Sequence, residues 1–321
     1  RRIAPLSAAA AWNLHHWDRL EEYIGAMTEN SLDGSFFRAI SAVHRNEHFE
    51  ARRFIDRSRH LLDTKLTALV GESYNRAYNV MVRVQQLSEL EEVIEYKRSN
   101  DAARRATIRR IWDVRLMGCQ RDVDTWQQLL AVRSMVVPPR DDMDIWLKFA
   151  GLCRKSGRLR LSHKTLTKLM GNDPSVAIEG VSSLPTSYPR VTFAYIKQLW
   201  AAGHRASAFE RLRLFSTTVG AVDTSLQAPV FLKLGEWQLA QLDGFDKESI
   251  PLVISDFRAA VTHNPHWYKA WHKWALVNFD VIAHHEQRGA PSSTLEPFLV
   301  PAVQGFFRCL ARDTPVLMHD G

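Results

Sequence analysis

Lysines that follow an aromatic residue by two positions recur along the chain, and they carry the clearest chemical signal in the sequence. Those with Leu or Tyr between the two are Lys148, Lys233 and Lys269, which follow Trp146, Phe231 and Trp267. If these aromatic residues pack alike in separate helical hairpins, the three ammonium groups face the same side of the protein. Ammonium groups held close together repel one another, and a polyanion bound between them relieves that repulsion. The pattern therefore predicts an anion-binding pocket.

Lys155 extends the predicted pocket because it lies seven residues after Lys148. That spacing is about two turns of an α-helix. Both lysines therefore share a face if the helix between them is continuous. The alternative is that each lysine extends its charged end from a packed helix into water, as most charged helix faces do. Spacing alone leaves both interpretations open.

Catalytic and metal chemistry is not predicted. The sequence has no Gly-rich phosphate loop, no His-Arg-Asp and no Asp-Phe-Gly, so a kinase base, metal ligand and nucleotide lysine are all missing. The histidine pairs His15-His16 and His284-His285 are each adjacent in sequence. Adjacent side chains on a helix point about 100° apart, and no carboxylate or cysteine stands at ligand spacing. We expect no catalytic residue, no metal and no cofactor in this chain.

Basic residues exceed acidic ones, 42 against 35, which gives a formal charge of +7 and favours anionic partners. One dense run could follow nucleic-acid phosphates. It consists of Arg104, Arg105, Arg109, Arg110 and Arg115. Because no RNA-binding module accompanies the run, a solvated face or a contact to an acidic protein surface is preferred, and no nucleic-acid partner is expected.

Helices are expected to position all of these side chains. Apolar residues recur at i, i+3, i+4 and i+7, whereas strand alternation is scarce. On the tetratricopeptide (TPR) template of ~34 residues, Trp146 takes the first aromatic position, Gly157 the turn and Leu166 the second-helix anchor. The prediction is an all-α fold, an α-solenoid of TPR-like helical hairpins.

Breaker residues predict the organisation along the chain. Arg98 to Asp101 is a polar break, and Asp141 or Asp142 suits a helix cap after two prolines. Ser88 to Glu91 has the spacing of a capping box and predicts a helix start. The predicted parts are N-terminal repeats over 1–137, further repeats over 138–308, a long loop near 171–189, a linker near 289–297 and a tail over 309–321.

The cysteines and the N-terminus bear on location. Cys119, Cys153 and Cys309 are far apart and show no CxxC pair, so a reducing compartment is expected. No apolar run approaches the roughly 18–20 residues that span a bilayer. The chain begins Arg1-Arg2 without an initiator Met or a signal peptide. We therefore expect it to be a fragment.

Several sequence segments resemble segments of the FAT region of target-of-rapamycin (TOR) kinases, and they follow one another in the same order as in that family. They include GESY at 71–74, LSELEEVI at 87–94, GCQR at 118–121, KSGRL at 155–159, FLKLGEWQ at 231–238, WYKAWH at 267–272 and VPAVQGFFR at 300–308. The resemblance runs from about residue 8 to residue 308, after which the tail departs from the family.

The resemblance implies a non-catalytic scaffold in a protein of the phosphatidylinositol-3-kinase-related kinase family. The parent enzyme would phosphorylate protein serine and threonine with ATP and Mg²⁺, and the FAT region would brace and regulate its kinase domain in nutrient and growth signalling. Implied partners are that kinase domain, a WD-repeat subunit and a substrate-recruiting subunit. The implied location is the cytoplasm, including vacuolar or lysosomal endomembrane surfaces, and also the nucleus.

FAT regions of this family also hold a highly phosphorylated inositol, such as inositol hexakisphosphate, in a basic pocket. The matching positions are Arg121, Lys148, Lys155, Lys233 and Lys269. Two basic positions of the family's pocket are replaced here, at Ala201 and Pro229, so a weaker affinity is expected.

Two other function classes are compatible with a basic helical protein. A free-standing TPR-like adaptor would bind acidic peptides, and it would carry its own initiator Met and polar capping repeats. A nucleic-acid binder would lose affinity linearly with log salt and ignore inositol phosphates.

Overall fold

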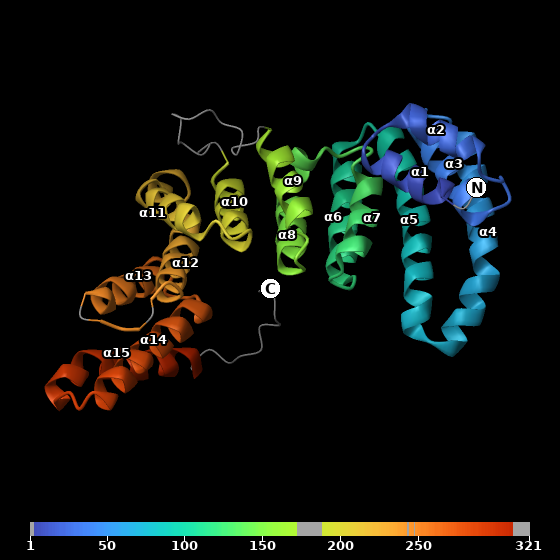
Figure 1. The fold of residues 1–321 in the computed structure, drawn as a ribbon. Coiled ribbons are helices and arrows are strands. Elements are labelled where there is room, and N and C mark those ends of the chain that lie inside the picture. The colour runs from blue at the N-terminus through green and yellow to red at the C-terminus, as the bar shows by residue number, and fades with distance from the viewer. Residues whose placement is uncertain (1–2, 172–187, 243, 247, 311–321) are drawn as a thin grey trace. The chain divides into compact units, whose positions relative to one another are not determined.

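The computed structural model describes residues 3–171, 188–242, 244–246 and 248–310, and every regular element within these ranges is a helix (Figure 1). The prediction of an all-α protein is confirmed. The chain divides into two compact units, Arg1–Leu169 and Met170–Gly321. Each unit is built from helices that pack on their sequence neighbours, as in an α-solenoid.

The first unit contains a long antiparallel hairpin, α4 and α5, which Figure 1 shows beside the shorter helices. Its elements are α1 (Ala4–Asn13), α2 (Trp17–Gly25), α3 (Leu32–His44), α4 (His48–Glu72), α5 (Tyr74–Arg98), α6 (Ala102–Gly118), α7 (Val123–Arg133), the 3₁₀ helix η1 (Pro139–Asp142), α8 (Met143–Lys155) and α9 (Leu159–Met170). Phe36, Ile40, Leu87 and Ile94 lie in its main core and are fully buried.

The second unit repeats the hairpin arrangement with α10–α11, α12–α13 and α14–α15 in contact. Its elements are α10 (Pro189–Ala201), α11 (Arg205–Val222), the 3₁₀ helix η2 (Thr224–Leu226), α12 (Gln227–Leu239), α13 (Ser249–His263), α14 (Tyr268–Gln287) and α15 (Ser292–Leu310). Small residues let these helices approach closely. A Cβ added at Gly235 would lie 2.8 Å from the Phe257 ring, and one at Gly305 would lie 2.7 Å from the Ala275 Cβ.

One backbone device closes five of the helical hairpins. A residue with positive φ follows the first helix, and the next residue's N–H donates to the carbonyl five positions back, which satisfies a free C-terminal carbonyl. The positive-φ residues are His15, Asn46, Gly157, Gly203 and Gly289. The corresponding N···O distances lie between 2.8 and 3.1 Å. The predicted turn at Gly157 is therefore confirmed.

The polar break between Arg98 and Asp101 is confirmed. Helix α5 ends at Arg98, and α6 begins at Ala102, where the Asp101 carboxylate accepts from the Ala103 N–H at 2.9 Å. Asp142 stands at the N-cap of α8, but its side chain makes no capping hydrogen bond.

The predicted helix start at Ser88 to Glu91 is wrong, because these residues lie in the middle of α5. The apolar positions Leu87, Leu90 and Ile94 continue one helical stripe through the region, and all three are fully buried. Burial of that stripe outweighs a local capping preference. The Glu89 side chain does not cap a helix start and is buried in the core.

Two predicted segments lie mostly outside the described residues, and a third lies within them. The loop near 171–189 falls mostly on residues 172–187, and the tail over 309–321 falls mostly on residues 311–321. Within the predicted linker 289–297, α15 already begins at Ser292, and Pro297 and Pro301 lie inside that helix. The division of the chain at residue 137 stays a prediction.

Candidate functional site

The first unit places three of the predicted pocket residues at its surface. Lys148 and Lys155 belong to one continuous helix, α8, which is the condition on which their shared face depended. Arg121 lies in the bend between α6 and α7. All three are exposed, and the Lys148 Nζ lies 3.7 Å from the Met117 Sδ. Their charged ends are therefore accessible to a ligand in solution.

The second unit holds the other two predicted residues, in different surroundings. Lys269 is exposed in the first turn of α14. Lys233 lies on α12, is half-buried, and donates to the Glu236 carboxylate. Lys273 of α14 approaches the same carboxylate, with 4.0 Å between its Nζ and the Glu236 Oε1. The structure thus brings two lysines to one acidic group.

Lys273 is absent from the predicted set, although a signal for it exists in the sequence. It follows Lys269 by four residues, which places both on one face of α14. Lys273 also follows an aromatic residue, Trp271, by two positions, but His272 stands between them, where the predicted lysines have Leu or Tyr. Glu236 could not be recognised as a partner either, because its contact with Lys273 depends on how α12 and α14 pack.

Four of the five arginines of the basic run, all but Arg110, make polar contacts inside the first unit. Arg104 pairs with Glu95 at 2.6 Å, and Arg115 pairs with Glu92 at 2.8 Å. Arg105 donates to the Tyr96 carbonyl at the end of α5, and Arg109 donates to the Asp141 carbonyl. These four guanidinium groups thus bind carboxylates or carbonyls of the first unit.

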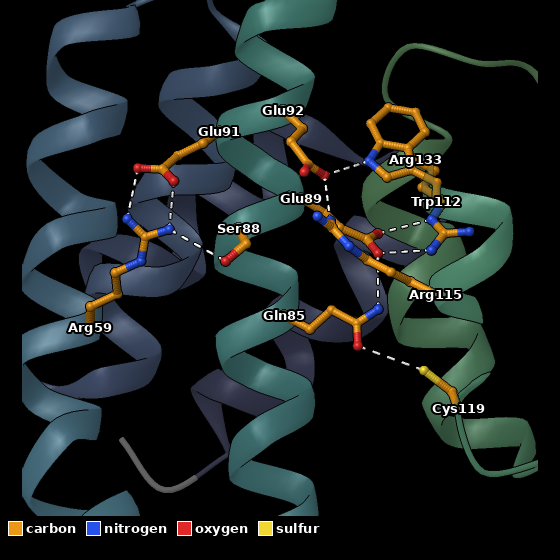
Figure 2. A network of polar contacts seen from close by, with 10 residues as sticks. All are labelled: Arg59, Gln85, Ser88, Glu89, Glu91, Glu92, Trp112, Arg115, Cys119 and Arg133. Carbon is orange, nitrogen blue, oxygen red and sulfur yellow. Dashed lines mark hydrogen bonds and ion pairs between the residues drawn. The ribbon is translucent and has the colours of Figure 1, made fainter. Parts of the chain in front are cut away.

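A buried ion pair joins α5 to α7 and was not predicted. Figure 2 shows Glu89 and Arg133 facing each other, with bidentate contacts of 2.7 and 2.9 Å. Their side chains are 0% and 3% exposed. Gln85 donates to the same carboxylate at 3.0 Å and also lies near Cys119. The second Nη of Arg133 has no hydrogen-bond partner in the described part of the chain.

The described residues contain no group of three or more His, Cys, Asp and Glu side chains arranged to hold a metal ion. Burial raises the pKa of the Cys119 and Cys153 thiols, the latter to about 11, so neither is poised as a nucleophile. None of the described helices is long and apolar enough to cross a bilayer. The surface lysines are thus the chain's candidate functional groups.

The comparisons with known proteins decide the family. The FAT domain model matches residues 4–314. The serine/threonine-protein kinase tor1 of Schizosaccharomyces pombe is 40% identical to this chain over 95% of its length. The chain belongs to the FAT domain family and corresponds to the FAT region of TOR kinases. The mTor kinase of Drosophila melanogaster is 39% identical over 97% of the chain, and the TOR kinase of Arabidopsis thaliana is 40% identical over 96%.

The FAT segment spans 14% of the length of each of these three relatives. A serine/threonine-protein kinase ATR from Oryza sativa is also similar, with 27% identity over 49% of the chain. Among solved structures, the crystal structure of MamA protein aligns with 61% of this chain and 87% of its own length, at 12% identity and a TM-score of 0.35.

Ala201 and Pro229 stand where the resemblance to the family led us to expect basic residues. Ala201 is the last residue of α10, and Pro229 lies in the first turn of α12, four residues before Lys233. Neither side chain can supply a positive charge, so the anion would rely on the remaining lysines. The joint role of Arg121, Lys148, Lys155, Lys233 and Lys269 in one pocket stays a prediction.

Proposed function

We propose that this FAT segment is a non-catalytic scaffold that braces and regulates the kinase domain of a TOR-type serine/threonine protein kinase. The observation that carries the proposal is the match to TOR kinases over at least 95% of the chain at about 40% identity. A stack of helical hairpins suits the role, because its long surface can contact another domain at many points. Kinase motifs are missing from this sequence, so phosphate transfer from ATP and Mg²⁺ would belong to another part of the parent.

The proposed partners follow from the same family membership. They are the kinase domain of the parent chain, a WD-repeat subunit and a substrate-recruiting subunit of a TOR complex. The proposed location is the cytoplasm, including vacuolar or lysosomal surfaces, and the nucleus. Growth and nutrient signalling is the process in which such a scaffold would act.

Co-purification tests the scaffold role. The FAT segment and the kinase domain of a TOR relative are co-expressed with separate tags, and an unrelated helical-repeat protein of similar charge serves as the control. Recovery of the kinase domain with the FAT segment but not with the control protein supports the proposal. Equal recovery with both proteins would show non-specific electrostatic binding and would contradict it.

The proposal includes a basic pocket for an inositol polyphosphate. Arg121, Lys148, Lys155 and Lys269 are exposed, and Lys233 is half-buried. An inositol with many phosphates offers enough negative charge to bind several lysines at once, whereas a single sulfate does not. The ligand would be structural, since no reactive group accompanies these lysines.

A thermal-shift titration tests the pocket. The FAT segment is titrated with inositol hexakisphosphate at two salt concentrations, and with sulfate and a short DNA duplex as comparison ligands. We expect a rise in melting temperature that is specific to the inositol phosphate and persists in the higher salt. An equal shift with DNA that disappears in salt would leave only a basic helical surface.

A further inference from the structure

Glu236 is the one acidic side chain among the contacts described for Lys233 and Lys273. It accepts from the Lys233 Nζ on its own helix, α12, and its other oxygen lies 4.0 Å from the Lys273 Nζ on α14. The Glu236 side chain is 21% exposed, the Lys233 side chain 28% and the Lys273 side chain 42%. The carboxylate is therefore still in contact with water and lies against two ammonium groups.

A third lysine lies on the same face of α14 as Lys273. Lys269 precedes Lys273 by four residues on α14, so both lie on one face of that helix. Lys233 precedes Glu236 by three residues on α12 and shares a face with it. One negative charge thus stands beside lysines from two helices, two of which belong to the proposed anion pocket.

A carboxylate in this position competes with any anion for the same lysines. It offsets part of the positive charge that an incoming phosphate would meet, and it already accepts a hydrogen bond that the phosphate would need. A ligand with one or two charges gains little by replacing it. A ligand with several phosphates binds the other lysines at the same time and offsets the loss.

We propose that Glu236 is the internal counter-charge of the anion pocket, and that Lys273 is a further anion-binding residue of it. This inference rests on the proposed function, because it concerns the same pocket. Without a ligand, Glu236 holds Lys233 and Lys273. When a polyphosphate binds, its oxygens take over both ammonium groups, and Glu236 sets the preference for highly charged ligands over sulfate.

Isothermal titration of the 321-residue chain with inositol hexakisphosphate and with sulfate tests the proposal. Glu236→Gln keeps the shape of the side chain and removes its charge. We expect this variant to bind inositol hexakisphosphate about fivefold more tightly than the wild type, which is the effect of one charge at ~4 Å in a water-like dielectric. We also expect the ratio of its affinities for inositol hexakisphosphate and for sulfate to be smaller than in the wild type. Lys273→Met is expected to weaken inositol hexakisphosphate binding by about the same factor.

Glu210→Gln is the matched control, because Glu210 is an exposed residue of α11 in the same unit and its loss changes the net charge equally. Its affinity should equal that of the wild type. Circular dichroism and thermal melting confirm that each variant is folded.

The outcomes separate this inference from the proposed function. If the wild type binds and Glu236→Gln binds no more tightly than Glu210→Gln, the counter-charge role is overturned and the pocket stands. If only Glu236→Gln binds, the counter-charge role is supported and the wild-type pocket is closed to this ligand. If neither binds, both proposals fail.

Discussion

At the residue scale, the Glu89–Arg133 pair is the most consequential contact that the structure adds. Both side chains are essentially buried, and the pair joins α5 to α7. A buried ion pair is weak evidence for net stability, because removing two charges from water costs several kcal/mol. Breaking the pair from one side is a different matter, since it leaves one charge buried and uncompensated.

Arg133→Ala should therefore lower the free energy of unfolding of the first unit by about 3–5 kcal/mol. The double variant Glu89→Leu, Arg133→Met should recover most of that loss, because no isolated charge remains. Urea unfolding followed by far-UV circular dichroism measures both variants. A double variant as unstable as Arg133→Ala would show that shape, and not charge pairing, is what matters at this position.

Asp256 provides a second residue-scale prediction. It is half-buried on α13, and burial raises the pKa of its carboxyl from 3.8 to about 6. A folded-state pKa above the unfolded value means that the protonated acid is favoured in the folded protein. The contribution to stability is thus present below pH ~4 and is lost as the pH rises through about 6.

Asp256→Asn should remove this pH dependence and raise the melting temperature at pH 7 relative to the wild type. Thermal melts between pH 4 and 7 measure the effect, and Asp280→Asn, at an exposed position of α14, is the control. If the melting temperatures of the wild type and Asp256→Asn changed identically with pH, the raised pKa of Asp256 would be contradicted.

At the element scale, the shared hairpin turn determines how one helix reverses into the next. The turn at Gly157 was predicted from the TPR template, and glycine suits it because glycine populates positive φ without strain. The turns at His15 and Asn46, which adopt the same conformation with φ of 58° and 63°, were not predicted. Asn and His adopt positive φ more often than other non-glycine residues but still uncommonly, so the residue type alone does not predict a turn there.

Gly157→Ala should destabilise the first unit by about 1 kcal/mol. An added Cβ meets nothing within 4 Å, so the cost comes from the positive φ alone. Gly151→Ala is the matched control, because it lies inside α8, has equal space around an added Cβ, and should gain roughly 0.5–1 kcal/mol of helix propensity. Chemical denaturation compares them, and an equal effect of both substitutions would contradict the turn argument.

The wrong prediction of a helix start at Ser88 to Glu91 has the same cause as the turns that were not predicted, which is that it relied on local sequence alone. A capping box is a local pattern of two side chains, whereas helix continuity there depends on core contacts made by Leu87, Leu90 and Ile94. The polar break at 98–101 was predicted correctly because no apolar stripe crosses it. Local signals succeed in this chain where burial does not oppose them.

At the scale of the whole molecule, the all-α class and the TPR-like hairpins followed from helical periodicity and a single repeat template. Lys148, Lys233 and Lys269 were found from their spacing to aromatic residues, and Lys155 from its spacing to Lys148. Both spacings are properties of the sequence. Their partners were not found, because Glu236 meets Lys273 only through the packing of α12 and α14. The groups that the arginines of the basic run contact likewise depend on how the helices pack, which the sequence pattern does not show.

The central claim is that lysines of this FAT segment bind a polyanion, and charge reversal tests it most directly. Lys148→Glu combined with Lys269→Glu is titrated with inositol hexakisphosphate against Lys65→Glu combined with Arg213→Glu, which changes the net charge equally at exposed positions of α4 and α11. We predict that the first variant loses binding with unchanged helicity and that the second keeps it. Equal binding by both variants would contradict the pocket.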